Sequence, residues 1–400
     1  MKETIFSPAD VLLPDYAAQD PAWAKWSVIA CDQFTSEKAY WDKARAFIGD
    51  APSALDLILP EAFLKTPEEE AQKARIRDAM NKVESITKRY SDALVYVERT
   101  LTGGVIRKGI VGKIDLKQYD FSAGSASAVR PTEATVLDRI PPRKKIRSEA
   151  AFELPHVMVF TDAQGALTDA AEKQKALLPK LYDFELMAGG GHLTGYLLQG
   201  NALTSVLQAI EEYESAHGKP GEVIYAVGDG NHSLAAAKAH YEDVKTEKAR
   251  YALCEIVDIA DDAIVFEPIY RIVKHCDVPD LLAFLEKKTG NDGQTVSILA
   301  KGIRKKLTLS PVHALTVGSL QIALDEYLAS HPDSECDYIH GEESLEALCK
   351  EDGVVGFLFD GMQKCELFPY VEQNGVLPRK TFSMGNSYSK RYYTELRKIR

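Results

Sequence analysis

The chain has 400 residues, of which 45% are hydrophobic and 27% are charged, and its formal net charge is −11. This composition is typical of a globular protein that is long enough for two or three domains. The acidic balance argues against a nucleic-acid partner, which normally requires a basic surface. No apolar run is long enough to span a bilayer, and the first residues lack the hydrophobic region of a signal peptide. We therefore expect a cytoplasmic protein without a membrane partner.

The first candidate catalytic residue is Asp32, which follows an apolar run at 26–31 that predicts a strand. Cys31 is interpreted as a buried thiol, with a catalytic role as the alternative. The six cysteines contain no CxxC pair, so we expect neither structural zinc nor a disulfide framework. All three tryptophans lie nearby, at positions 23, 26 and 41. Aromatic residues this dense favour a packed hydrophobic patch over a ligand-stacking role.

Residues 61–90 are charged and predict a solvated amphipathic helix. Two strands are then expected at 94–99 and 105–113, joined by a hairpin turn at 102–104. The next segment, 129–147, is rich in basic residues although the whole chain is acidic. Its candidate phosphate ligands are Arg130 and Arg139, because the guanidinium fork suits phosphate, together with Thr132 and Glu133. The alternative for both arginines is a solvated surface, which is the favoured interpretation for 143–147.

A buried strand is predicted at 154–161 and helices at 165–180 and 202–217. Between the helices, Gly189-Gly190-Gly191 lacks the Gly-Lys-Ser/Thr sequence of a P-loop, so a hairpin is favoured over a phosphate-binding loop.

The central stretch, 221–238, combines a short apolar strand, a polar turn and an Ala-rich helix. The first N–H groups of such a helix form an anion site suited to phosphate. Asp229 and His232 are candidate catalytic residues beside that site, and Gly230, Asn231 and Ser233 are candidate phosphate ligands. The alternative is an ordinary strand-to-helix connection in which Asp229 and His232 serve as caps.

Later strands are expected at 251–258 and 264–273, and a smaller α/β unit follows from residue 277. Arg271 lies inside an apolar strand and needs a partner, either Glu267 or a bound phosphate. The tail at 375–390, which contains Lys380, is rich in hydroxyls and cations. It is either a disordered end or a segment that folds back over the site.

Four of these segments together resemble domain-of-unknown-function family 1015. Its Asp-Gly-His-His-Arg signature corresponds to the turn at 229–233, where Asn231 and Ser233 replace the usual histidine and arginine. Its other segments, in the same order along the chain, correspond to Arg130-Pro131-Thr132-Glu133, Pro268-Ile269-Tyr270-Arg271 and Pro378-Arg379-Lys380-Thr381. Thr132 and Tyr270 replace histidines of the usual pattern. The departures indicate a divergent subgroup of the family.

The signature turn is similar to that of the ParB/sulfiredoxin-like superfamily, which includes kinases for free serine. The resemblance implies an α/β fold with a mixed sheet, a catalytic region at 1–276 and a smaller C-terminal α/β domain at 277–400, whose tail folds back on the site in one interpretation. It also implies transfer of a phosphoryl group from ATP, ADP or pyrophosphate to a small hydroxyl acceptor such as L-serine, with Mg²⁺ bound at Asp229. In this scheme Asp32 or Asp229 is the base, His232 is a donor or base, and the cations are Arg130, Arg139, Arg271 and Lys380.

Two other functions remain open from the sequence. If water could reach the bound phosphate, the same phosphate-binding turn would make the protein a phosphohydrolase of phosphoserine-like substrates. A chain that still binds the phosphate but no longer catalyses its transfer would be a nucleotide- or anion-binding regulator. The replacements at Asn231 and Ser233 would fit this alternative. A homodimer is also left open.

Overall fold

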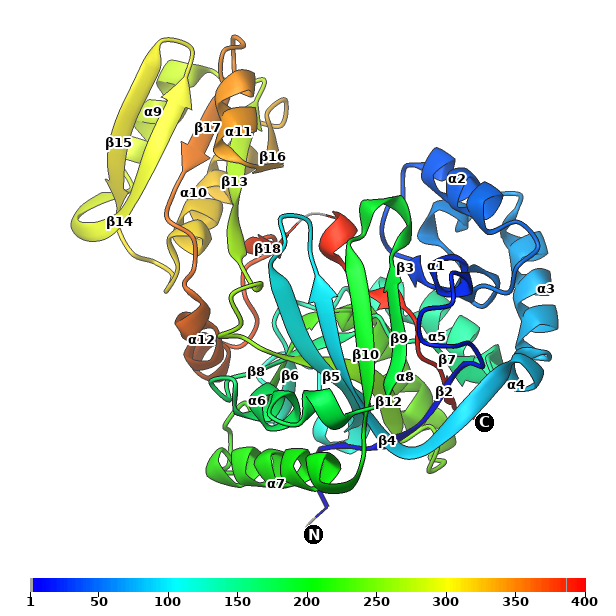
Figure 1. Cartoon of the computed structure of the whole chain (residues 1–400). Helices are drawn as coiled ribbons and strands as arrows, with labels where there is room; N and C mark the ends of the chain where they lie inside the picture. The colour runs from blue at the N-terminus through cyan, green and yellow to red at the C-terminus, as the bar shows by residue number, and fades with distance from the viewer. Residues whose placement is uncertain (1–2, 386) are drawn as a thin grey trace. The chain divides into compact units, whose positions relative to one another are not determined.

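The computed structural model describes residues 3–385 and 387–400, except for the side chain at position 292. These residues form two units (Figure 1). Unit 1 contains the chain up to Ile264, Phe368–Val376 and residues 387–400, and unit 2 contains Val265–Leu367 and Leu377–Gly385. The expected mixed α/β fold with a second, smaller sheet unit is confirmed. The expected boundary at residue 277 lies later than the structural one, because β13 (Phe266–Lys274) pairs with strands of the second sheet.

The large sheet of unit 1 is mixed. Its central path contains eight strands, in the spatial order β6 (Val129–Pro131), β11 (Tyr225–Asp229), β8 (Met158–Thr161), β12 (Tyr251–Asp258), β5 (Ile106–Asp115), β4 (Thr87–Thr100), β10 (His192–Leu198) and β9 (Lys180–Glu185). Outside this path, β1 (Phe6–Ser7) pairs with β5, and β2 (Ala9–Pro14) pairs with β4. The β6–β11 and β8–β12 pairs are parallel. The predicted hairpin of β4 and β5 is confirmed, and so is that of β9 and β10.

Both faces of this sheet are buried, as alternation along β4 shows. Val95 and Val97 belong to one hydrophobic cluster and Leu94 and Tyr96 to another, because successive side chains of a strand point to opposite faces. The first cluster is covered by α1 (Ala22–Trp26), α2 (Lys38–Ile48) and α3 (Glu69–Met80). The second is covered by α6 (Ala166–Glu172), α7 (Gly200–Ala216) and α8 (Asn231–Val244).

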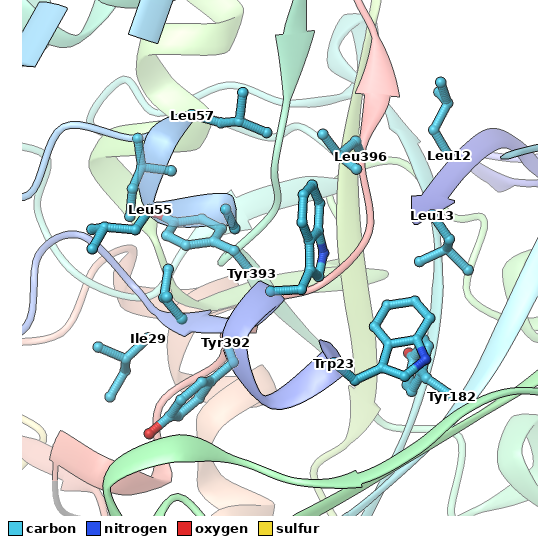
Figure 2. Close-up of a cluster of buried hydrophobic side chains, with 14 of the residues drawn as sticks. Leu12, Leu13, Trp23, Ile29, Leu55, Leu57, Tyr182, Tyr392, Tyr393 and Leu396 are labelled. Atoms are coloured by element: carbon cyan, nitrogen blue, oxygen red, sulfur yellow. The ribbon is translucent and has the colours of Figure 1, made fainter. Parts of the chain in front are cut away.

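The three tryptophans lie in the first cluster, which confirms the predicted hydrophobic patch. Figure 2 shows Trp23 beside Tyr182, and the Trp23 ring also stacks on Phe184 at a centroid distance of 5.7 Å.

The long helix predicted at 61–90 is wrong in part. The charged segment forms α3 and the single turn α4 (Val83–Ile86), and β4 already begins at Thr87. Residues 87–90 are extended because they pair with β2, and this tertiary pairing overrides the local helix propensity.

Residues 387–400, called here the 387–400 segment, pair with two short strands of unit 1. Its strand β19 (Tyr392–Tyr393) pairs with β3 (Val28–Ile29), and β20 (Arg397–Lys398) pairs with β7 (Phe152–Glu153). Figure 2 shows Tyr392, Tyr393 and Leu396 among the apolar side chains of the N-terminal region. The segment is therefore part of the core, and Figure 1 shows it in red.

Buried ions hold the same segment. The Arg391 guanidinium pairs with Glu255 and with Glu395, at 2.7 Å each, and it also donates to the carbonyl of Pro155 at 2.6 Å. Arg107 donates to the carbonyl of Ser389 at 3.0 Å. Because each charge is paired, burial of these groups is tolerated.

Unit 2 has a sheet with the order β15 (Ile303–Leu309), β14 (Thr289–Ala300), β17 (Val355–Leu358), β13 and β16 (Glu335–His340), and β18 (Phe382–Met384) also pairs with β13. Helices α9 (Val278–Glu286) and α10 (Thr316–Ser330) pack on one apolar cluster of the sheet, and α11 (Glu342–Leu348) packs on another. In the described part of the chain, no helix combines the length and the apolar character needed to cross a membrane.

Candidate active site

The strand-to-helix turn of the central stretch forms as predicted. Strand β11 ends at Asp229, and α8 begins at Asn231. Gly230 has a φ of +79°, and a Cβ at this position would lie 3.0 Å from the Val157 Cα, so the turn requires glycine. No described side chain caps the first turn of α8. Its N–H groups are therefore available to an anion.

A lysine from the 387–400 segment reaches this turn. The Lys390 ammonium lies 3.1 Å from the Asp229 carboxylate, and both side chains are 20% exposed. Asp229 raises the pKa of Lys390 despite the opposing effect of burial, and Asp32 and Glu133 raise it further. Lys390 is therefore a charged ammonium among three carboxylates at the start of α8.

Asp32 is ionised in this environment. Burial acts to raise the pKa of the Asp32 carboxyl, but the nearby His156, a hydrogen bond from Gln33 and the Lys390 charge outweigh it, and the pKa lies below its ordinary value. The Gln33 Nε2 donates to Asp32 Oδ1 at 3.0 Å. The Asp32 Oδ2 lies 4.0 Å from the His156 Nε2.

The His232 ring forms a hydrogen bond with the backbone. Its Nε2 accepts the Val136 N–H at 3.1 Å, so the hydrogen of the neutral ring is on Nδ1. Burial lowers the pKa of His232, and Arg143 and Arg139 lower it further. At neutral pH the ring is uncharged and has one N–H to donate. This arrangement favours the expected donor role of His232 over the role of base.

A second histidine lies in a chain of hydrogen bonds. The His156 Nδ1 is 2.6 Å from the Tyr393 hydroxyl, and its Nε2 is 3.1 Å from the Ser233 Oγ. The Tyr393 hydroxyl accepts the Cys31 N–H at 3.2 Å and donates to the Cys31 Sγ at 3.1 Å. Burial raises the pKa of Cys31 to about 12. The thiol stays protonated at neutral pH, and the Cys31 side chain is half-buried where the sequence predicted a buried thiol.

A cavity of about 820 Å³ opens beside this chain of hydrogen bonds. Cys31, His156, Ser233 and Tyr393 are on its wall, which is otherwise largely apolar with charged groups interspersed. Pockets for small molecules and cofactors commonly have this size and composition. The cavity therefore has room for a ligand the size of a nucleotide, in contact with the first turn of α8.

The comparison with protein families agrees with the resemblance seen in the sequence. Residues 12–352 match the model of a family described as "Protein of unknown function (DUF1015)". The chain belongs to the DUF1015 family. No curated protein matches it.

Solved structures also match this DUF1015 chain. Structures of a free serine kinase with AMP or ADP bound match at 12% identity and TM-scores of 0.39 and 0.40, covering 72% of this chain and 91% of the kinase. A conserved hypothetical protein from Pyrococcus furiosus matches at 12% identity and a TM-score of 0.36, with 70% and 93% coverage. SbnI with a C-terminal truncation from Staphylococcus aureus matches at 10% identity and 0.34, with 69% and 83% coverage.

The structure of this DUF1015 member holds two predicted phosphate ligands in backbone contacts of the sheet. The Arg130 Nε donates to the carbonyl of Ser127 at 2.7 Å, and its Nη2 donates to that of Gly221, before the start of β11. The Thr132 hydroxyl donates to the carbonyl of Val227 at 2.8 Å. Both side chains are therefore engaged in holding β6 against the β11 region, and their contact with a phosphate stays a prediction.

Two other predicted cations belong to unit 2. The Arg271 guanidinium donates to Gln321 and to the carbonyls of Ile269, Arg379 and Lys380, at 2.6–2.9 Å. The partners of the buried Arg271 guanidinium are therefore carbonyl and amide oxygens. They take the place of the two partners expected from the sequence, which were Glu267 and a bound phosphate. Lys380 is exposed in the same unit. Unit 1 alone gathers Asp32, Glu133 and Asp229 around Lys390, and it places Arg139 close enough to His232 to lower its pKa.

Three residues of the site were missed in the sequence. Lys390 and Tyr393 lie far along the chain from the turn, and His156 is inside a segment whose apolar character predicted only a buried strand. For Lys390 the signal was the cation-rich tail that was considered as a segment folding back. For His156 the signal was a lone histidine directly before an apolar strand.

Among the described residues, no group of three or more His, Cys, Asp or Glu side chains forms a metal site. A Mg²⁺ that is bound with a phosphate substrate usually takes only one or two carboxylates from the protein. Asp229 supplies an oxygen ligand of that kind, so the residues present fit this metal.

Proposed function

We propose that this DUF1015 chain is a phosphotransferase that moves a phosphoryl group from a nucleotide or pyrophosphate to a small hydroxyl compound, with L-serine as the first candidate. One observation carries the proposal. The Lys390 ammonium lies 3.1 Å from Asp229, at the uncapped start of α8, where Asp32 and Glu133 are also near. A cation, a helix N-terminus and carboxylates at one point meet the needs of phosphoryl transfer.

The positive groups would hold the phosphates. Phosphoryl transfer depends mainly on positioning and on neutralising the charge of three equatorial oxygens. The N–H groups at the start of α8 and the Lys390 ammonium provide that neutralisation, and the His232 Nδ1–H adds a neutral donor. Asp229 would hold Mg²⁺, which would supply further charge neutralisation when bound.

Asp32 is the carboxylate best suited to receive the proton of the acceptor hydroxyl. It is ionised, its Oδ2 lies 4.0 Å from the His156 Nε2, and its side chain is 31% exposed. Asp229, in contrast, already accepts from Lys390 and from the Gly230 N–H at 2.9 Å. A weakly basic carboxylate is sufficient, because the transition state is loose and little proton transfer is needed early.

Phosphorus NMR tests this proposal. The purified protein is incubated with Mg²⁺ and L-serine, and ATP, ADP and pyrophosphate are offered in separate samples. We expect a phosphoserine resonance in at least one sample. Lys390→Met should slow its appearance by at least about 100-fold, the usual cost of losing one transition-state contact.

Lys398→Met is the matched control, because Lys398 belongs to the same segment and pairs with the exposed Glu84. It should keep the wild-type rate. Release of inorganic phosphate without phosphoserine would instead identify a phosphohydrolase. Binding of a donor without any turnover would identify a regulator, and either result would contradict the kinase proposal.

A further inference from the structure

Ser233, the residue that departs from the usual arginine of the family signature, lies in an arrangement typical of a nucleophile. Its Oγ is 3.1 Å from the His156 Nε2, and the His156 Nδ1 is 2.6 Å from the Tyr393 hydroxyl. A hydroxyl within hydrogen-bond reach of a base, with the base oriented by a third group, is the geometry of an activated nucleophile.

The proposal uses one of the two tautomers of His156 that the contacts around Tyr393 allow. In this tautomer the Tyr393 hydroxyl donates to the Cys31 Sγ, and the His156 Nδ1 carries the hydrogen of the 2.6 Å contact. The Nε2 then has a free lone pair and accepts from Ser233. Burial raises the pKa of Tyr393 well above its ordinary value, so the tyrosine stays neutral. The Asp32 carboxylate, 4.0 Å from Nε2, would stabilise the imidazolium after proton uptake.

Ser233 is also placed where a phosphate would be stabilised. It lies in the first turn of α8, where the N–H groups lack a side-chain cap, and it is on the wall of the 820 Å³ cavity. A phosphate covalently attached at a helix N-terminus is stabilised by the helix dipole.

A second feature at the same turn indicates a ligand. Asn231 is only 9% exposed, and its Oδ1 has no hydrogen-bond partner among the described residues. A buried polar atom of this kind normally has a partner, so a bound molecule would complete the site.

We propose that Ser233 is the first acceptor of the phosphoryl group, and that the reaction passes through a phosphoserine at this position. The inference rests on the proposed phosphotransferase function. In the first step the Ser233 Oγ–P bond forms while the bond from phosphorus to the leaving nucleotide or phosphate breaks, and the Oγ proton moves to His156 Nε2. In the second step the substrate hydroxyl attacks phosphorus and its proton passes to Asp32, while the released Ser233 Oγ regains its proton from His156.

The experiment uses the full chain with Mg²⁺ and each donor, without any acceptor. Labelled ADP is added to the ATP sample, labelled AMP to the ADP sample and labelled phosphate to the pyrophosphate sample. We expect the labelled compound to be converted into labelled donor by reversal of the first step. We also expect tandem mass spectrometry to find a phosphate on Ser233. Both signals should disappear in Ser233→Ala. They should fall by at least about 100-fold in His156→Gln, because a general base contributes at least that much.

Ser148→Ala, on α5 (Ile140–Glu149) packed beside α8, is the matched control and should leave both signals unchanged. Ser233→Thr keeps a hydroxyl and should retain part of the exchange, while thermal melting verifies that each variant folds. If Ser233→Ala forms free phosphoserine at the wild-type rate, and no phosphate is found on the wild-type chain, transfer is direct. That result overturns this inference and leaves the phosphotransferase proposal in place. Absence of transfer to serine and to the chain overturns both.

Discussion

At the scale of single residues, the two histidines of the site differ through their hydrogen bonds. The His232 Nε2 accepts a backbone N–H, whereas the His156 Nε2 faces a hydroxyl. Residue type alone gives both side chains the same chemistry, and only the partners of each ring nitrogen separate a structural donor from a candidate base.

The contacts of His232 predict a loss of stability in acid. Its pKa in the folded state is lowered below the ordinary value of 6.5 by burial, Arg143 and Arg139. The unfolded chain therefore takes up the proton first, and the contribution to stability that is present above pH 6.5 is lost as the pH falls through the folded-state pKa. NMR titration should show the His232 ring titrating below pH 6.5. In His232→Gln, the acid loss of melting temperature should be smaller than in the wild type.

Lys390 predicts the opposite dependence at high pH. Asp229 raises its folded-state pKa above 10.5, so the stabilisation is fully present below pH 10.5 and is lost as the pH rises through the folded-state pKa. Lys390→Met should cost about 1.5–3 kcal/mol at neutral pH, the range for a hydrogen bond to a charged group. Chemical denaturation of both proteins over a range of pH measures this difference. A difference that stays constant above pH 10.5 would contradict the pairing.

At the scale of elements, the turn between β11 and α8 depends on one glycine. Gly230→Ala should destabilise the chain by about 1–2 kcal/mol for its left-handed conformation, with an added cost for the Val157 contact. Gly375→Ala is a matched control, because Gly375 has the same φ of +79° and a Cβ there would meet nothing within 4 Å. Denaturant unfolding should give the larger loss for Gly230→Ala. Equal losses would show that Val157 moves away without cost.

The 387–400 segment depends in the same way on Arg391. Removing its charge in Arg391→Met leaves Glu255 and Glu395 buried without their partner, which typically costs about 3–5 kcal/mol. Lys398→Met breaks an exposed pair of the same segment and should cost less than about 1 kcal/mol. Urea unfolding of both variants compares the two values. We expect Arg391→Met also to weaken phosphate binding, because Lys390 is the preceding residue.

The local sequence was sufficient to predict the strand, turn and helix at 221–238, since an apolar run, a glycine turn and an Ala-rich run each act within a few residues. It was also sufficient to place Asp229 and Ser233 at the start of α8. Lys390 and Tyr393 could not be assigned to that turn, because their position depends on ion pairs and strand contacts with distant parts of the chain. For the same reason the backbone contacts of Arg130 could not be predicted, since carbonyl partners do not appear in a residue pattern.

At the scale of the molecule, each unit has hydrophobic clusters of its own. A chain that ends after residue 385 loses β19 and β20 and the buried ion pairs of Arg391 and Arg397, while every strand of unit 2 remains. Hydrogen exchange should therefore show lost protection in β3 and β7 and unchanged protection in β13, β14 and β17. Loss of protection in the unit 2 strands would show that the two units fold as one.

The late position of the 387–400 segment also has a consequence for protein synthesis. A ribosome makes the strand–turn–helix and then all of unit 2 before it reaches the codons for Lys390 and Tyr393. Every product of premature termination before codon 390 therefore lacks the ammonium that faces Asp229, even when much of its sheet has folded. A nonsense mutation within the 387–400 segment would therefore leave both sheets encoded and still remove the cation on which the proposed phosphoryl transfer depends.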